Sequence, residues 1–191
     1  MPPAMGTGFQ DLEHARPVRT LWIALIVSTG LCLSTVFACV TPFAALATLA
    51  ALKLGRRDAI SIMALIWMAN QAIGYGLLGY PWTWNSAAWG VAIGISAGLA
   101  FAAARGLSTT RPAPFAISLP ALAAFAAFEL GLYGAGFVLP GADGAFAASV
   151  VWQVFRLNAI TLVGLMAAHR LAMLVAYPAW HDAPAYRTAG V

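Results

Sequence analysis

Apolar stretches of about 20 residues, separated by short polar turns, fill most of this 191-residue chain. About 20 apolar residues is the length that an α-helix needs to cross the hydrocarbon core of a bilayer. Hydrophobic residues make up 62% of the chain and charged residues only 8%, whereas soluble domains have roughly 45–50% and 25%. We therefore expect an all-α integral membrane protein, a compact bundle of six transmembrane helices in a single domain.

The polar turns set the expected boundaries of these helices. Two helices share residues 20–54, and the others cover 59–80, 87–104, 115–139 and 146–175. Because residues 20–54 are fewer than the roughly 40 that two full spans require, at least one of the first two helices must be short, with a turn near residues 39–42. The expected division is a cytoplasmic tail at 1–18, a transmembrane domain at 19–177 and a second cytoplasmic tail at 178–191.

The basic residues predict the orientation of the bundle. In a six-span arrangement all the basic residues outside the spans fall on one side of the membrane: Arg16, Arg19, Lys53, Arg56, Arg57, Arg105, Arg111, Arg170 and Arg187. The three opposite connectors contain no Lys or Arg. The positive-inside rule then makes both termini cytoplasmic and places the protein in a plasma membrane, the inner membrane of a bacterium. The net charge of +4 is spread singly or in pairs between apolar segments, so no nucleic-acid partner is implied.

Polar residues within the apolar stretches mark a candidate site. Arg156 lies inside the last stretch, and a charge at that depth indicates a functional site by default. Asn70, Gln71, Glu129, Arg156 and Asn158 all lie about ten residues below the outer ends of their helices, roughly 15 Å at 1.5 Å per residue. We expect Glu129 and Arg156 to form an ion pair, with the three amides completing a polar floor. The alternatives are that the pair only fixes helix register and that the amides only join helices.

Aromatic residues and a cysteine lie nearer the expected outer surface. Trp82, Trp84 and Asn85 belong to one outer connector, and Trp152 lies near the start of the last stretch. These residues are expected to form the rim of a binding pocket, although Trp82, Trp84, Trp89 and Trp152 also suit interfacial anchors. Cys39 adjoins the turn between the two short helices, and irregular backbone at membrane depth is tolerated where it lines a wet cavity.

Motifs for catalysis are missing from the sequence. There is no HExxH, no GxSxG and no phosphate-binding glycine loop, and the only histidines, His14, His169 and His181, lie near the two ends of the chain. We therefore expect no enzymatic activity and no cofactor of its own, and active transport would need an energising partner.

A short first hairpin followed by the sequence Pro-Phe-Ala-Ala-Leu-Ala at residues 42–47, within six expected helices, resembles the S components of energy-coupling factor vitamin transporters. The resemblance implies a vitamin-binding cavity that opens outward beneath the three charge-poor connectors. It also implies docking on a transmembrane coupling subunit driven by two ATPases. Small residues on the first helices mediate that docking in the family, and Ala47 and Ala51 are the matching candidates here.

Within that family the chain is most similar to the BtuM-like vitamin B12 transporters, in which a cysteine coordinates the cobalt of the corrin. The resemblance implies cobalamin as ligand and Cys39 as the cobalt ligand, with Cys32 as a competitor. A soft thiolate suits cobalt, and an aromatic rim suits a large macrocycle. The alternative is a non-transporting structural subunit that assembles with partner helices through Gly90, Gly94 and Gly98, a GxxxGxxxG row that allows close helix contact.

Overall fold

The computed structural model is all-helical in the part of the chain that it describes, residues 7–36, 41–108 and 116–181, with side chains described for 18–32, 41–108 and 116–174. The helices, in chain order, are α1 (Thr7–Val36), α2 (Phe43–Lys53), α3 (Arg56–Gly76), α4 (Trp84–Leu107), α5 (Ser118–Gly136) and α6 (Ala148–His181). The number and order of these helices agree with the six helices expected from the sequence. Because α1 begins at Thr7, the segment expected to be an N-terminal tail at 1–18 is partly helical.

Four of these helices are long and apolar enough to cross a membrane: α3, α4, α5 and residues Ala148–Leu174 of α6. An apolar stretch, Val18–Cys32, lies among the described side chains of α1, and the whole of α2 is shorter than a full span. The prediction of a short helix within residues 20–54 is confirmed, since α2 has 11 residues. Proline shapes its start, because Pro42 immediately precedes the first helical residue.

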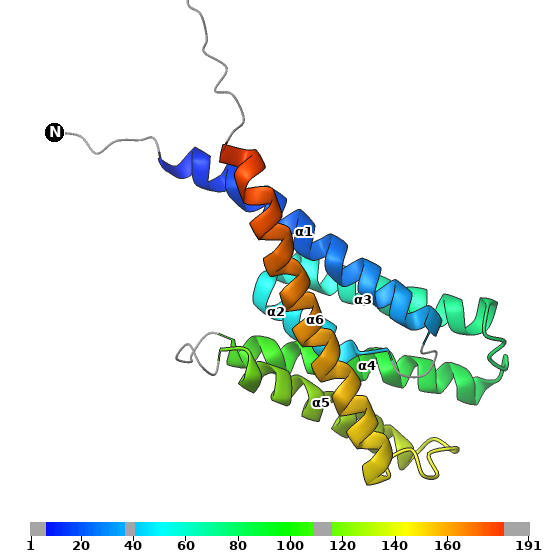
Figure 1. Ribbon diagram of the computed structural model, residues 1–191. Helices are drawn as coiled ribbons and strands as arrows, with labels where there is room; N and C mark the ends of the chain where they lie inside the picture. The colour runs from blue at the N-terminus through cyan, green and yellow to red at the C-terminus, as the bar shows by residue number, and fades with distance from the viewer. Residues whose placement is uncertain (1–6, 37–40, 109–115, 182–191) are drawn as a thin grey trace, which may run out of the picture.

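The connectors group at the two ends of the bundle (Figure 1). The start of α1 and the end of α6 lie close together at one end, on the same side as the turn between α2 and α3. The connector between α3 and α4 and the connector between α5 and α6 lie at the other end. This alternation is the one that the sequence predicts for the two faces of a six-helix protein.

The short helix α2 occupies the centre of the bundle. It contacts all five other helices, and its residues from Phe43 to Ala51 are all buried. The sequence of α2, FAALATLAALK, is apolar on every side, as expected of a helix surrounded by protein. Its one internal hydroxyl, Thr48 Oγ1, donates a hydrogen bond of 2.7 Å to the Ala44 carbonyl. The core of the molecule is therefore built around α2.

Both ends of α2 are capped by side chains from other helices. Pro42 offers no side-chain cap, and the backbone N–H of Ala45 instead donates to Asn158 Oδ1 of α6 at 2.9 Å. At the other end, Arg105 Nη1 of α4 donates to the carbonyls of Ala51 at 2.6 Å and Leu54 at 3.0 Å. The end groups of a buried helix require such partners, because water cannot reach them. Asn158 and Arg105 therefore supply the hydrogen bonds that allow a short helix to lie inside the bundle.

Candidate binding cavity between the helices

A cavity of about 490 Å³ lies at the end of the bundle that holds the α3–α4 and α5–α6 connectors. Its lining comes from α2 to α6 and from both connectors: Thr41, Phe43, Asn70, Gln71, Tyr80, Ser86, Trp89, Gly90, Ile93, Phe128, Glu129, Leu132, Gly141, Ala145, Phe146, Val150 and Val154. Ligand sites are typically concave, mostly apolar and supplied with a few polar groups. This cavity has those properties.

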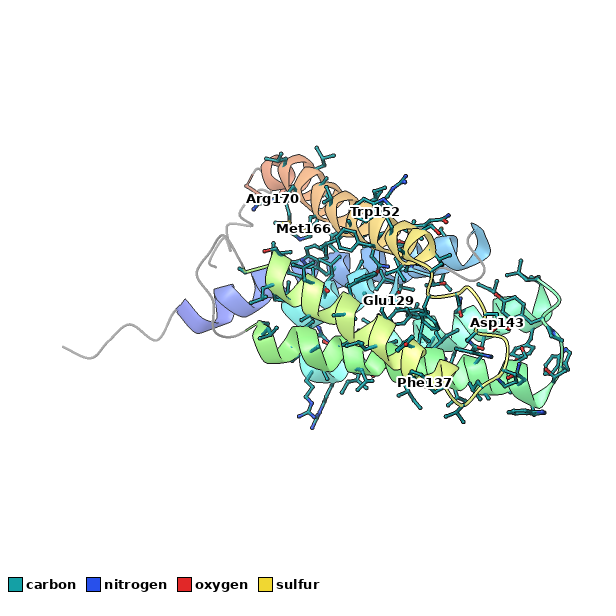
Figure 2. All side chains as sticks on the ribbon, turned by 90° about the horizontal axis from the view of Figure 1, so that it is seen from below. Glu129, Phe137, Asp143, Trp152, Met166 and Arg170 are labelled. Atoms are coloured by element: carbon teal, nitrogen blue, oxygen red, sulfur yellow. The ribbon has the colours of Figure 1, made fainter. Side chains whose placement is uncertain are left out.

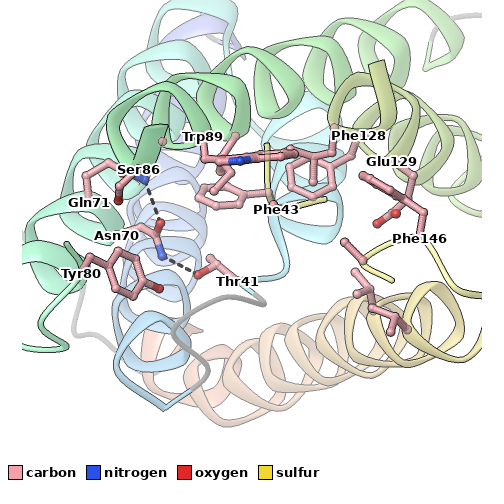
Figure 3. Close-up of a pocket in the computed structure, with 17 residues that line it drawn as sticks. Thr41, Phe43, Asn70, Gln71, Tyr80, Ser86, Trp89, Phe128, Glu129 and Phe146 are labelled. Atoms are coloured by element: carbon pink, nitrogen blue, oxygen red, sulfur yellow. Dashed lines mark hydrogen bonds between the residues drawn. The ribbon is translucent and has the colours of Figure 1, made fainter. Parts of the chain in front are cut away.

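One side of the cavity carries a chain of hydrogen-bonded amides (Figure 3). Gln71 Nε2 donates to Asn70 Oδ1 at 3.2 Å, and Asn70 Nδ2 donates to Thr41 Oγ1 at 2.8 Å. The Gln71 amide oxygen lies against the backbone of Gly90 in α4, where any larger residue would collide with it. Gly90 therefore makes room for Gln71, and the chain links α3 to the start of α2.

The opposite side of the cavity carries Glu129, and aromatic rings lie between the two sides (Figure 3). The rings of Phe43 and Phe128 pack with their centroids 5.9 Å apart, and Trp89 lies beside them. Phe146, from the α5–α6 connector, lies on the side of Glu129. The cavity thus combines an amide side, an aromatic wall and a carboxylate.

The α5–α6 connector is attached to the start of α4. Trp89 Nε1 donates to the Pro140 carbonyl at 2.9 Å, and Asn85 Nδ2 donates to the same oxygen at 3.3 Å. The connector turns at Gly141 (φ 89°) and Gly144 (φ 75°), a backbone conformation that glycine adopts without strain. Two donors on one carbonyl hold this connector over the cavity.

The structure brings three of the predicted site residues together, since Asn70, Gln71 and Glu129 all line the cavity. Whether they bind a ligand stays a prediction. Asn85 lies next to the cavity and holds Pro140 instead of lining the wall. Cys39 lies outside the described residues, and the thiol of Cys32 is exposed.

The predicted tryptophan rim lies elsewhere. Trp82 and Trp84 are 84% and 70% exposed. They line a shallow groove on the outside of α3 and α4, which adjoins the cavity at Gln71 and Gly90. Trp152 is 58% exposed and stacks on Phe155 with ring centroids 5.5 Å apart. These positions suit interfacial anchors, which is the alternative that the sequence left open.

The predicted ion pair between Glu129 and Arg156 is wrong. Arg156 is exposed on α6 and does not line the cavity, whereas Glu129 lies within the bundle on α5 (Figure 2). Among the side chains that the structure describes, the ion pair is Arg19 with Asp58, 2.7 Å from Nε to Oδ2, which joins α1 to α3. The two residues share a depth along their helices but not a direction, and α5 and α6 have few contacts with each other.

The structure also places Asn158, Ala47 and Ala51 away from the sites predicted for them. Asn158 is buried and caps α2, so it supports the fold and does not line the cavity. Ala47 and Ala51 are 0% and 2% exposed, because α2 lies at the centre of the bundle. They cannot form a docking surface for a partner subunit.

The glycine row of α4 serves mainly this chain. Gly90 accommodates Gln71, and a Cβ at Gly94 would lie 2.8 Å from the Trp67 ring of α3. Trp67 Nε1 also donates to the Gly90 carbonyl at 2.8 Å. Gly98 alone of the three has nothing within 4 Å of an added Cβ among the described atoms. Gly90 and Gly94 therefore contact α3, whereas Gly94 and Gly98 also line a groove between α3 and α4. The structural-subunit alternative stays a prediction.

Sequence reasoning missed the aromatic wall. For Trp89 the sequence favours an interfacial anchor over ligand stacking, and it assigns no role to the rings of Phe43, Phe128 and Phe146. A usable signal exists in α4, where Ser86, Trp89, Gly90 and Ile93 line the cavity at the i, i+3, i+4, i+7 spacing of one helix face.

The fold and the site together describe an all-helical protein with four helices of membrane-spanning length around a cavity. Comparison with family models, with curated proteins and with solved structures finds no match to this chain.

Proposed function

We propose that this protein is a membrane-embedded binding protein for a vitamin or a similar small solute, which it takes up from outside the cell. The observation that supports this most directly is the cavity of about 490 Å³ with a polar side and an aromatic wall, at the connector end of the bundle. A purely structural bundle has no need of such a space, because protein interiors normally pack without voids.

The position of the cavity supports capture from the outer side. It lies beneath connectors that contain no Lys or Arg, and the positive-inside rule places such connectors outside the cell. Uptake against a gradient would then require a partner, and we propose an energising transmembrane coupling subunit with ATPases. Its docking surface involves residues other than Ala47 and Ala51.

The volume bears on the choice of ligand. Pockets for drug-sized molecules measure about 300–1,000 Å³, and this cavity lies in the lower half of that range. Cobalamin, with its corrin ring and nucleotide loop, is much larger than a drug-sized molecule. The geometry therefore favours a smaller solute, and cobalamin remains the ligand that the family resemblance suggests.

Thermal unfolding of the purified protein in lipid nanodiscs tests the proposal. The ligands to be tested are the water-soluble vitamins, cobalamin included. Binding is detectable in this way because a ligand at 100 times its Kd stabilises the folded state by about 2.7 kcal/mol. We expect one of the smaller solutes to raise the Tm. Ala145→Trp should abolish that rise because Ala145 lines the cavity, and Ala147→Trp is the matched control on the same connector.

Binding of cobalamin can also be followed by its visible absorption spectrum. Binding with a change in the cobalt absorption spectrum that depends on Cys39 would restore cobalamin as the ligand. If none of the tested ligands stabilises the protein and uptake-deficient cells are not rescued by its expression, the proposed function is wrong.

A further inference from the structure

The polar groups of the cavity are unbalanced in charge. Among the described residues that line it, one is acidic, Glu129, and none is Lys, Arg or His. Glu129 forms no ion pair with any described residue, and its carboxylate points toward the space between the lining side chains (Figure 3). A carboxylate without a counter-charge in an apolar site is costly. A cationic ligand would remove that cost.

The polar side of the cavity is bonded within the protein. Asn70 and Gln71 each donate along the amide chain, and Trp89 donates to Pro140. The Gln71 amide oxygen lies against Gly90. Among the described lining residues, the carboxylate of Glu129 is therefore the charged group that faces the cavity.

The aromatic wall fits the same chemistry. Phe43, Trp89 and Phe128 lie between the amide side and the carboxylate side (Figure 3), so a flat ring that spans the cavity would contact their faces. Aromatic faces attract cations, more strongly when water is excluded. Two independent features, the charge and the rings, select one kind of ligand.

We propose that the cavity selects a small organic cation with a flat ring, its positive charge near Glu129 and its ring against Phe43, Trp89 and Phe128. This inference rests on the proposed function and specifies its ligand class. It also explains why Arg156 faces away from the cavity, because a guanidinium there would neutralise Glu129 and repel such a ligand.

Three probes with one ring and different charges test the inference: 1-methylnicotinamide (cation), nicotinamide (neutral) and nicotinate (anion). Isothermal titration in nanodiscs, with empty nanodiscs as blank, should show the cation binding roughly tenfold or more tightly than the neutral amide, with the anion weakest. Glu129→Gln should remove the preference for the cation, so that 1-methylnicotinamide and nicotinamide bind with similar affinity. Asp143→Asn removes an exposed carboxylate of the α5–α6 connector (Figure 2) and should leave both affinities unchanged.

A second variant separates charge from folding. Glu129→Asp keeps the charge and should keep the preference for the cation, and gel filtration confirms that each variant is folded. Tighter binding of nicotinate than of 1-methylnicotinamide, or a preference that survives Glu129→Gln, would overturn the inference. If none of the three binds while another uncharged or anionic solute stabilises the protein, the ligand class is wrong and the proposed function stands. If no solute binds at all, both fail.

Discussion

At the scale of single residues, direction around the helix matters as much as depth. Arg156 and Asn158 were assigned to one polar floor because they lie at one depth, yet residues two apart on a helix do not face the same way. Asn158 faces α2 and is buried, whereas Arg156 is exposed. Val154 lies one turn before Asn158 and lines the cavity. The helical spacing alone would have separated the two residues, whereas the partner of Asn158 in α2, 113 positions away, could not be found from the sequence.

Replacement of Asn158 tests its role as a cap. Asn158→Ala removes the acceptor for the Ala45 N–H and should lower the free energy of unfolding by about 1–2 kcal/mol, the usual cost of losing a helix N-cap. Arg156→Gln is the matched control, two residues away and exposed, and should change it by less than about 0.5 kcal/mol. Reversible unfolding in mixed micelles measures both. A larger loss for the arginine variant would restore Arg156 as a structural residue.

At the scale of helices, lengths and order followed from the sequence but packing partners did not. Apolar run lengths and the Pro42 break predicted six helices with a short one among the first two. The all-apolar sequence of α2 indicated burial, yet which helices surround it depends on contacts between distant segments. The most extensive contacts in the bundle join α4 and α5, which are consecutive in the chain, and there the backbone of Gly131 packs against Ser96.

Two glycines on α5 offer a matched comparison of this packing. A Cβ at Gly131 would lie 2.5 Å from Ser96 Oγ, whereas at Gly134 nothing described lies within 4 Å. Gly131→Ala should therefore lower stability by about 1–3 kcal/mol through overpacking. Gly134→Ala should leave it unchanged or raise it by up to about 1 kcal/mol, because alanine favours the helix. Thermal unfolding of both variants checks this, and equal effects would mean that α4 and α5 do not pack as described.

At the scale of the whole molecule, the grouping of connectors agrees with the charge pattern of the sequence. The turn between α2 and α3, which follows Lys53 and precedes Arg57, lies at the same end as the start of α1. The aromatic connector with Trp82 and Trp84 lies at the opposite end. The sequence predicted this division because topology depends on local charge, whereas the cavity depends on residues from five helices and two connectors.

Single cysteines test the orientation in intact cells. On a background without Cys32 and Cys39, a cysteine at Asp143 should react with a membrane-impermeant maleimide, whereas one at Arg57 should react only after the cells are lysed. Both positions are outside the cavity lining. The reverse pattern of labelling would place the cavity on the cytoplasmic side and exclude capture from outside.

The central position of α2 has a consequence for how the chain is made. Eleven residues of helix span only about 16 Å, roughly half the hydrocarbon core, so α2 cannot rest in the bilayer unaided as it leaves the ribosome. Its two caps, Arg105 and Asn158, are synthesised about 50 and 110 residues later. Chains that stop at residue 147 should therefore be degraded faster in pulse-chase experiments than the full chain. The uncapped ends of α2 would thus mark a chain whose synthesis is not yet complete.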